Sequence, residues 1–494
     1  VRDGDQWVLN GQKIWTSAGH LADHIFTLVR TDPDAPRHKG ISFILVDMRQ
    51  PGVEVRPIKM ISGESEFNEV FYTDAVASND DVVGGLNNGW AVAMTLLGFE
   101  RGEAAATGPI RFQAEVDRLL LLAKADRQIG LMDTLAAAFG DRRDAARTQH
   151  GLADILRARI FAIACGYEDG NDLGTLRSDP MLKIACGRLP ETGPDLASQP
   201  TVSRMENAPG LRDLVRMQAA MLELWCKSYK KPPDSIVLDI DDTTDVVHGR
   251  QQLCLFNAHA DEYCFMPVHI YDASSGHCLL AGLRPGKTPA GKEVACHIRR
   301  TVRHIRKYWP DTEIVWRGDG HYGRDEAMAF CESQQNVRYI FGFAPNAVLK
   351  DMVFPDADEV CVRRALAQSE KERGFAELQY KAKSWKSGPR RTIARIEATP
   401  RGADTRYVVT DLEGDPAHLY EQVYCARGTA ENLIKRHKSQ LASDRTSCRS
   451  ALANQMRLVL HSAAYWLMRL LSAAVPASEP LRSEEHTSEL QSRG

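Results

Sequence analysis

The sequence predicts a multidomain protein with a small antiparallel β-domain at the N-terminus, a helical region, and then an α/β domain with a strand-rich insertion. A chain of 494 residues is too long for one ordinary hydrophobic core, which indicates several domains. Short β-type segments fill the first hundred residues, Ala- and Leu-rich helical patterns follow, and apolar strands alternate with helices from about residue 235. With 43% hydrophobic residues and no run of about 18 apolar residues, we expect a globular protein that does not bind a membrane.

The N-terminal β-domain begins with "WVLNGQKIW", residues 7–15, in which Asn10 and Gly11 separate two alternating segments. Asn-Gly favours a two-residue turn with positive φ at both residues, so we expect a tight hairpin there. The segments "ISFILVDM", "VEVRPIKM" and "NEVFYTDAVA" continue the β pattern. From "NNGWAVAMTLL" the pattern becomes helical, and Asp-Arg pairs recur after residue 124, where we place the end of a first domain, 1–124.

Cysteine usage and charge restrict the class of protein. The eleven cysteines are scattered without a C-x-x-C pair, which favours reduced thiols in a cytoplasmic protein over a zinc ribbon or a disulfide framework. A net charge of −3 excludes a general polycation, so any contact with nucleic acid has to depend on local clusters. Between Lys381 and Arg406 there are eight Lys/Arg against two acids, including Arg390 and Arg391. This run predicts a phosphate-contacting surface or, equally, ordinary solvated charge.

Two apolar strands of the α/β part end in carboxylates. In "SIVLDIDDTTDVVHG", Asp239 and Asp241 share one face of a strand, and "TEIVWRGDGHYG" brings Asp319 after a second apolar run. Sites form at the carboxyl ends of strands in an α/β sheet, and carboxylate oxygens suit Mg²⁺ or Mn²⁺. The alternative is that these aspartates only cap helices or form turns.

A polar helical pattern follows near the C-terminus. Tyr424, Arg427, Glu431 and Lys438 are spaced by 3, 4 and 7 residues. At ~100° per residue this spacing places all four in a helical stripe of roughly 60°, so four functional groups would converge. A solvated helix face with ion pairs four residues apart would give the same pattern.

The first domain resembles a known family. "DGDQWVLNGQKIWTSAGHLADHIFTLVRTDP" and "GISFILVDMRQPGVEVRPI" are similar to the middle β-domain of acyl-CoA dehydrogenases. The resemblance implies flavin contacts for Trp15 and Ser17, whereas Trp15 as a plain core aromatic is the alternative. The chain shows neither the family's N-terminal helical domain nor the catalytic Glu of its C-terminal bundle, so we expect a vestigial FAD site, without bound FAD, in an inactive fragment.

The remainder, from about Ala125 to Val475, resembles bacterial insertion-sequence transposases with a DDE triad in an RNase H-like fold. The pattern Tyr-x2-Arg-x3-Glu-x6-Lys carries this resemblance, together with "RPGKTPAGKE" and "RGDGHYGR". It implies that the catalytic, metal-binding triad is Asp241, Asp319 and Glu431. Asp241 is preferred over Asp239 and Asp242 because it precedes x-Thr, and Asp239 then supports the metal site from behind.

The same resemblance implies the partners. The triad would hold two Mg²⁺ or Mn²⁺ ions, and Tyr424, Arg427 and Lys438 would contact DNA phosphates. The DNA would be double-stranded, comprising the terminal inverted repeats of the element and a target, with self-association of the protein on it. "LASQPTVSRMENA" resembles a short helix-turn-helix in which Ser198, Gln199, Ser203 and Arg204 reach DNA, and a packing pair of helices is the alternative.

We therefore expect four segments. They are a dehydrogenase fragment (1–124), a helical DNA-binding region (125–230), an RNase H-like catalytic domain (231–476) with an insertion near 345–415, and a disordered tail (477–494). "RSEEHTSELQS" in this tail resembles a translated sequencing adapter and is expected to be an artefact. The predicted function is metal-dependent DNA nicking and strand transfer by a cytoplasmic, nucleoid-associated transposase. An FAD-dependent acyl-CoA dehydrogenase-like protein and a catalytically dead DNA-binding element are the alternatives.

Overall fold

The computed structural model describes residues 1–60 and 65–474, except for the side chains of 100–112, 114 and 115. The chain forms two compact units, Val1–Glu115 and Val116–Gly494, which are described separately. The tail expected at 477–494 lies outside the described residues. Within those residues, no helix is long and apolar enough to cross a membrane.

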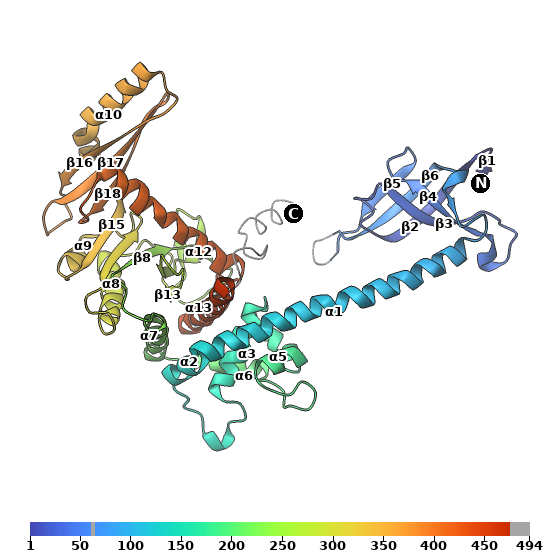
Figure 1. The fold of residues 1–494 in the computed structure, drawn as a ribbon, viewed down its shortest axis with the longest axis horizontal. Coiled ribbons are helices and arrows are strands. Elements are labelled where there is room, and N and C mark those ends of the chain that lie inside the picture. The colour runs from blue at the N-terminus through green and yellow to red at the C-terminus, as the bar shows by residue number, and fades with distance from the viewer. Residues whose placement is uncertain (61–64, 475–494) are drawn as a thin grey trace. The chain divides into compact units, whose positions relative to one another are not determined.

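Unit 1 consists of two antiparallel sheets (Figure 1). The strand orders are β1-β2-β6-β5 and β3-β4-β7. The strands are β1 (Arg2–Asp3), β2 (Gln6–Ser17), β3 (His24–Arg30), β4 (Ile41–Asp47), β5 (Val53–Pro57), β6 (Phe67–Ser78) and β7 (Val82–Val83). Buried side chains from β2, β4 and β6, such as Leu9, Ile44 and Val70, form one core. The alternating pattern of the sequence therefore builds two sheets that pack face to face.

The hairpin predicted at Asn10-Gly11 is wrong. β2 continues through both residues, and only Gly11 of the two has positive φ, at 147°. The pairing of β2 with β6 shifts register between Leu9 and Gly11, which is a β-bulge. The Asn10 side chain explains the difference, because it accepts from the Asp74 backbone N–H at 2.9 Å and donates to the Asp74 carboxylate at 2.8 Å. Asn-Gly thus bends a continuous strand instead of reversing it.

Unit 2 begins with a helical region. The long helix α1 (Gly89–Ile129) crosses the boundary between the units, and its last turns bury Leu122 and Ala125 in the core of unit 2. The following helices are α2 (Leu131–Phe139), α3 (Leu152–Ala164), α4 (Leu173–Leu176), α5 (Pro180–Ala185), α6 (Gln199–Asn207) and α7 (Leu211–Ser228). The segment predicted as a helix-turn-helix forms a single helix, α6, with Ser198 at its N-cap. Its buried Val202 and Met205 face the core.

An eight-stranded mixed sheet forms the rest of unit 2. Its order is β13-β12-β8-β14-β15-β18-β17-β16, with β14 parallel to β8 and to β15, and the other pairs antiparallel. The strands are β8 (Ser235–Asp242), β12 (Val268–Asp272), β13 (Cys278–Gly282), β14 (Glu313–Gly318), β15 (Val337–Phe343), β16 (Glu372–Tyr380), β17 (Arg390–Thr399) and β18 (Gly402–Thr410). β16 to β18, from the expected insertion, continue the same sheet because β18 pairs with β15.

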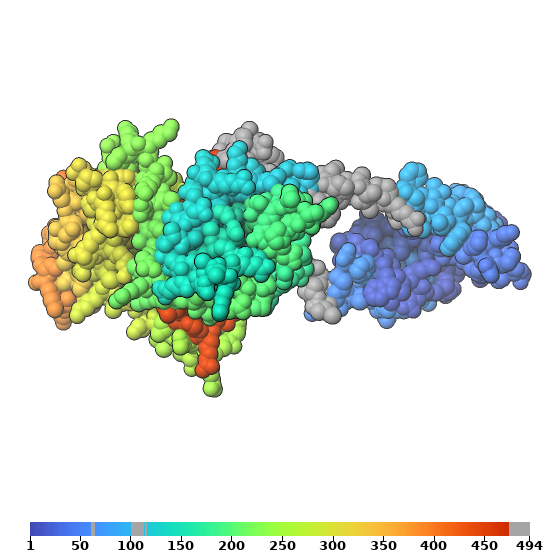
Figure 2. Space-filling model, turned by 90° about the horizontal axis from the view of Figure 1, so that it is seen from below, coloured from blue at the N-terminus to red at the C-terminus, as the bar shows by residue number. Residues whose placement is uncertain are grey.

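Helices cover the sheet and connect it to the helical region (Figure 1). They are α8 (Gly291–Ile305), α9 (Asp325–Glu332), α10 (Ala347–Ala367), α11 (Pro416–His418), α12 (Gly428–Ser439) and α13 (Ala451–Ala474). α13 packs against both β13 and α3, so one continuous core runs through the unit. In Figure 2 the teal-to-green surface of the helical region adjoins the yellow-green surface of the sheet region.

A separate three-stranded sheet projects after β8. It contains β9 (Asp245–Val246), β10 (Leu255–Asn257) and β11 (Glu262–Phe265) in the order β10-β11-β9. Both pairings are antiparallel. This sheet therefore begins three residues beyond the end of β8.

Candidate active site

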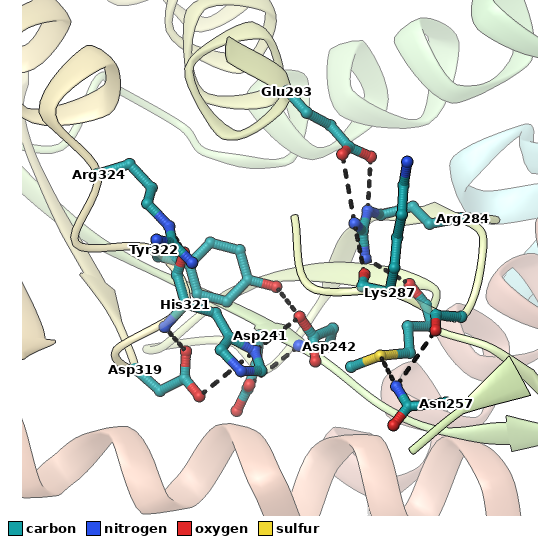
Figure 3. A network of polar contacts seen from close by, with 12 residues as sticks. Asp241, Asp242, Asn257, Arg284, Lys287, Glu293, Asp319, His321, Tyr322 and Arg324 are labelled. Atoms are coloured by element: carbon teal, nitrogen blue, oxygen red, sulfur yellow. Dashed lines mark hydrogen bonds and ion pairs between the residues drawn. The ribbon is translucent and has the colours of Figure 1, made fainter. Parts of the chain in front are cut away.

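Two aspartates lie side by side at the carboxyl edge of the large sheet. β8 and β14 are parallel, and their register pairs Ile240 with Gly318, so Asp241 and Asp319 follow at adjacent positions. Asp241 is buried, whereas the Asp319 side chain is 34% exposed. Figure 3 shows both carboxylates in one group with Asp242, His321 and Tyr322. The parallel pairing of two apolar strands is therefore what brings these charges together.

The burial of Asp241 disfavours its ionised form. Burial raises the pKa of Asp241 to about 7, the Arg427 guanidinium opposes this shift, and the Asp319 carboxylate adds to it. The Asp242 backbone N–H donates to Asp241 Oδ1 at 2.9 Å. A buried carboxylate beside a second carboxylate is a place where a cation is strongly favoured.

The segment that carries the Tyr-Arg-Glu-Lys pattern is not one α-helix. Leu419–Tyr424 is a π-helical turn, Cys425–Arg427 is a 3-10 turn, and only Gly428–Ser439 is α-helical. The prediction of one 60° stripe is therefore wrong, since it assumed ~100° per residue throughout. Tyr424 instead lies over β15, where a Cβ on Gly342 would meet its hydroxyl at 2.5 Å. Glycine at position 342 makes room for this ring.

Arg427 connects two of the predicted triad residues. Its Nη1 donates to Asp241 Oδ2 at 2.7 Å and its Nη2 to Glu431 Oε1 at 2.7 Å. The Arg427 side chain is 16% exposed and that of Glu431 is 60% exposed. The guanidinium thus occupies the space between a buried carboxylate on β8 and an accessible carboxylate on α12.

Asp239 and Arg317 form a buried ion pair behind the site. Arg317 Nε and Nη2 donate to the two oxygens of Asp239 at 2.7 and 2.8 Å, and the two side chains are 6% and 1% exposed. Arg317 Nη1 also donates to the Val423 carbonyl at 2.9 Å. Arg317 therefore joins β8, β14 and the residue that precedes Tyr424. Both oxygens of Asp239 accept hydrogen bonds from Arg317.

His321 and Tyr322 belong to the site although the sequence analysis did not single them out. The Tyr322 hydroxyl donates to Asp242 Oδ2 at 3.0 Å, and His321 Nδ1 lies 3.3 Å from the same oxygen. The His321 backbone N–H donates to Asp319 Oδ1 at 2.8 Å. Their position directly after Asp319 in "RGDGHYG" was the available signal. Asp242 is thereby turned toward β14 and held there.

Lys438 braces the loop that follows β8. Its Nζ donates to the Thr244 carbonyl at 2.7 Å and lies 3.3 Å from Asp245 Oδ1. Lys438 also lines a cavity of about 460 Å³ with Asp241, Glu431 and other residues of β8 and α12. Lys438 is therefore at the site but already has protein partners.

The carboxylates of Asp241, Asp319 and Glu431 are of the type that binds divalent cations. In the described residues, no three acidic, His or Cys side chains are gathered closely enough to hold a metal ion. Arg427 is bound between Asp241 and Glu431 instead, which shows that this space accommodates positive charge. The raised pKa of Asp241 indicates the same preference. Hard carboxylate oxygens at such a place fit Mg²⁺ or Mn²⁺ once the guanidinium moves away.

A second cavity lies in the helical region. It has a volume of about 930 Å³ and is lined by five arginines and three aspartates, namely Arg142, Arg143, Arg147, Arg177, Arg204, Asp141, Asp144 and Asp195. Within the described part of the chain, Arg204 donates only to Thr201 Oγ1, at 3.1 Å, and pairs with no carboxylate. The cavity therefore carries a net positive charge that Arg204 presents to solvent.

The predicted basic run does not form an open surface at its centre. Arg390 is buried and bonds both oxygens of Glu332 at 2.6 and 3.0 Å, with Asp325 at 2.8 Å. Arg391 pairs with Glu377 at 2.8 Å and donates to the Gly414 carbonyl. Arg390 and Arg391 thus hold the insertion strands to their neighbours. The prediction that they form an exposed basic surface is wrong.

Trp15 lies at the surface of unit 1. It is 63% exposed with φ at 66°, and its ring meets Phe67 edge-on at 5.9 Å. The alternative of a core aromatic is therefore excluded. Ser17 is also exposed, two residues further along β2.

Two parallel strands of unit 2 thus end in Asp241 and Asp319, and Arg427 links Asp241 to Glu431 on α12. The family model for the transposase DDE domain, group 1, matches residues 118–492, and the chain belongs to this family. The model for the acyl-CoA dehydrogenase middle domain matches residues 1–75. Both resemblances stated from the sequence are confirmed.

Individual relatives match the N-terminal part. The chain is 50% identical over 122 residues to acyl-CoA dehydrogenase IpdE1 of Mycobacterium tuberculosis, which covers 25% of this chain and 32% of the relative. It is 44% identical over 177 residues to acyl-CoA dehydrogenase FadE34 of the same organism, covering 36% and 24%. The chain thus spans a third or less of the length of these curated relatives.

We expect the Arg317–Asp239 pair to contribute strongly to the stability of unit 2. Arg317→Met leaves the Asp239 carboxylate buried without a counterion, so we expect the free energy of unfolding of unit 2 to fall by about 3–5 kcal/mol. Replacing both residues, with Asp239→Leu added, should recover most of this loss because no buried charge stays unpaired. Urea unfolding followed by circular dichroism measures both changes.

Arg338→Met is the matched control on the neighbouring strand β15. Arg338 pairs with Asp411 at 3.8 Å and its side chain is 46% exposed, so a loss of at most about 1 kcal/mol is expected. A loss in Arg317→Met as small as in this control would contradict the structural role of the pair.

Proposed function

We propose that this chain is a DNA transposase in which Asp241, Asp319 and Glu431 form the phosphoryl-transfer site. The observation that carries the proposal is the placement of Asp241 and Asp319 at adjacent ends of parallel strands, with Glu431 linked to Asp241 through Arg427. Membership of the transposase family supports the same assignment. The reaction is nicking of the element's ends by water, followed by attack of the freed 3′-hydroxyl on target DNA.

The topology of the sheet supports an RNase H-like catalytic domain. β8, β12 and β13 form an antiparallel meander, and β14 and β15 then add in parallel on the other side of β8. β8 lies at the centre of this five-stranded portion and carries the first aspartate. In this fold the insertion, β16 to β18, extends the sheet from β15 before the chain returns with Glu431.

The three carboxylates would hold two Mg²⁺ or Mn²⁺ ions. When bound, such ions activate an attacking oxygen and neutralise charge on the leaving 3′ oxygen. Asp241 supplies a buried, fixed carboxylate, and Glu431 supplies an accessible one on α12. Asp239 and Arg317 hold Asp241 and Asp319 at their positions on neighbouring strands.

Arg427 would change partners when DNA arrives. A phosphate can take over the two donors that now bind Asp241 and Glu431, since guanidinium groups bind phosphate and carboxylate in the same way. The Tyr424 hydroxyl, over β15, would lie beside the same phosphate. Lys438 contributes positive charge to the cavity while it braces the loop after β8.

The helical region is proposed to bind the terminal inverted repeats. Arg204 on α6, near Ser198, Gln199 and Ser203, presents a guanidinium without a carboxylate partner in the described residues. The arginine-lined cavity gives this face the charge that DNA phosphates require. We further propose self-association on the DNA and location at the bacterial nucleoid in the cytoplasm.

The N-terminal unit is proposed to be an inactive remnant joined near residue 124. Trp15 and Ser17 are exposed as flavin contacts would be, but the described part of unit 1 contains no helical bundle that could bring a catalytic Glu to them. Flavin chemistry needs a base within hydrogen-bond reach of the substrate carbon. FAD would therefore bind weakly or not at all.

Glu431→Gln tests the catalytic assignment. The amide keeps the size of the side chain but removes the charge that acts on the transition state, so DNA binding should persist while Mn²⁺-dependent nicking falls by several orders of magnitude, on the order of 10³ or more. Binding and nicking are measured on the same DNA. Glu359→Gln, an exposed carboxylate on α10, is the matched control and should nick like wild type.

Near wild-type nicking by Glu431→Gln would show that residues 424–438 are only a charged surface. Binding without nicking by the wild-type protein would instead support a catalytically dead DNA-binding element.

Arg204→Ala tests the DNA-binding region. Loss of one phosphate contact should weaken binding to all sequences alike and reduce the slope of log affinity against log salt by about one unit. Arg56→Ala is the charge-matched control in unit 1, because Arg56 is already paired with Glu54 at 2.7 Å. An unchanged slope in Arg204→Ala would place DNA on another face.

The inactivity of unit 1 is tested with acyl-CoA substrates. The purified chain should be colourless and should reduce no electron acceptor, because unit 1 alone is expected to place no base at the α-carbon of the substrate. An intact acyl-CoA dehydrogenase serves as the positive control. Any acyl-CoA-dependent reduction above background would contradict the proposal.

A further inference from the structure

The three-stranded sheet β9–β11 has no part in the chemistry proposed above, yet it adjoins the site. Its first residue, Asp245, is bound by Lys438, which lines the same cavity as Asp241 and Glu431. Val246 pairs with Cys264, so Tyr263 lies beside the start of this sheet. The start of β9 is therefore tied through Lys438 to the cavity that contains the carboxylates.

Two aromatic side chains are exposed on this sheet. Phe256 on β10 is 52% exposed and Tyr263 on β11 is 57% exposed. They are cross-strand partners, with ring centroids 5.5 Å apart at an angle of 67°. Aromatic rings are usually buried because of their large apolar area, so a fixed and exposed pair indicates a contact surface.

Tyr263 faces a cavity that contains unpaired positive charge. The cavity has a volume of about 600 Å³, and its lining includes Arg250, Arg449 and Tyr263 but no carboxylate. Asp261 and Glu262, at the nearby turn, do not line it. In the part of the chain that the structure describes, neither guanidinium has a hydrogen-bond or ion-pair partner. The cavity thus combines an aromatic ring with two uncompensated cations.

The walls of this cavity are held in place by the rest of unit 2. Gln251 Nε2 donates to the Thr446 carbonyl at 2.7 Å, and the Gln252 backbone N–H donates to the Arg449 carbonyl at 3.0 Å. Asn257, seen in Figure 3, donates to the Gly286 carbonyl at 3.2 Å. The backbone that carries the aromatic pair and the arginines is therefore fixed before a ligand arrives, which lowers the cost of binding.

We propose that Tyr263, Phe256, Arg250 and Arg449 form a binding site for an unpaired nucleotide of the DNA next to the catalytic carboxylates. The base stacks on the aromatic pair, which accepts any base, and the two arginines bind the phosphate. This inference rests on the proposed function, because it requires DNA at the neighbouring site. A second copy of the chain fits less well, since a two-fold interface would bring the same unpaired arginines together.

The test compares two DNA probes and a set of variants of the full chain. One probe is a blunt duplex, and the other is the same duplex with a short single-stranded overhang that contains 2-aminopurine, whose fluorescence is quenched by stacking. The variants are Tyr263→Ala, Phe256→Ala, Tyr263→Phe and Arg250→Ala. Phe354→Ala on α10, which is 68% exposed, is the matched control.

Wild type should bind the overhang probe more tightly than the blunt duplex and quench its fluorescence. Tyr263→Ala and Phe256→Ala should each lose about tenfold in affinity for the overhang probe, with little change for the blunt duplex. Arg250→Ala should weaken binding while quenching persists at saturation, and Tyr263→Phe and Phe354→Ala should behave as wild type.

Two outcomes would overturn the inference while leaving the transposase proposal intact. One is unchanged overhang binding and quenching by Tyr263→Ala in a protein that still nicks DNA. The other is a lower molecular mass of the Tyr263→Ala protein than of wild type, measured by light scattering, without a change in quenching. That result would identify a protein interface. Failure of wild type to bind either probe would overturn both proposals.

Discussion

The buried pair of Arg317 and Asp239 is the constraint on which the candidate site depends. One guanidinium bonds both oxygens of a carboxylate on β8, originates on β14 itself, and holds the Val423 carbonyl just before Tyr424. Because side chains alternate along a strand, Asp241 lies on the same face of β8 as Asp239, and Asp319 directly follows the end of β14, two residues beyond Arg317. Burying an ion pair is costly unless its donors are used. Here Nε and Nη2 of Arg317 bond the two oxygens of Asp239, and Nη1 bonds the Val423 carbonyl. The pair therefore fixes β8, which carries Asp241, and β14, which precedes Asp319, against the π-helical turn Leu419–Tyr424.

The parts of this arrangement that depend on local pattern could be predicted from the sequence. Apolar runs ending in Asp241 and Asp319 indicated neighbouring strand ends, and the register of β8 with β14 places these residues side by side. The change from β-type to helical segments predicted the antiparallel N-terminal unit and the sheet with helices of unit 2, but not the two sheets of unit 1 or the strand order of unit 2. Periodicity is sufficient for such features because it is set by the backbone.

Features that depend on tertiary partners could not be predicted. Asn10-Gly11 has the composition of a turn, but Asp74 across the sheet captures the Asn10 side chain and makes a bulge. The Tyr424 to Lys438 spacing gave no sign of the π and 3-10 turns before α12. The sequence around Arg390 predicts surface charge, but Glu332 and Asp325, about sixty residues away, bind it in the interior. In each case the decisive group is distant in the sequence, and no local pattern reveals it.

We propose that Asp241, Asp319 and Glu431 gather around divalent ions when DNA displaces Arg427. Anomalous scattering from manganese, in crystals of the full chain with Mn²⁺ and the DNA of the element's ends, tests it most directly. We expect manganese bound by these three carboxylates, with Arg427 on a DNA phosphate. Manganese located only elsewhere, with Arg427 still between Asp241 and Glu431 in the DNA-bound protein, would contradict it.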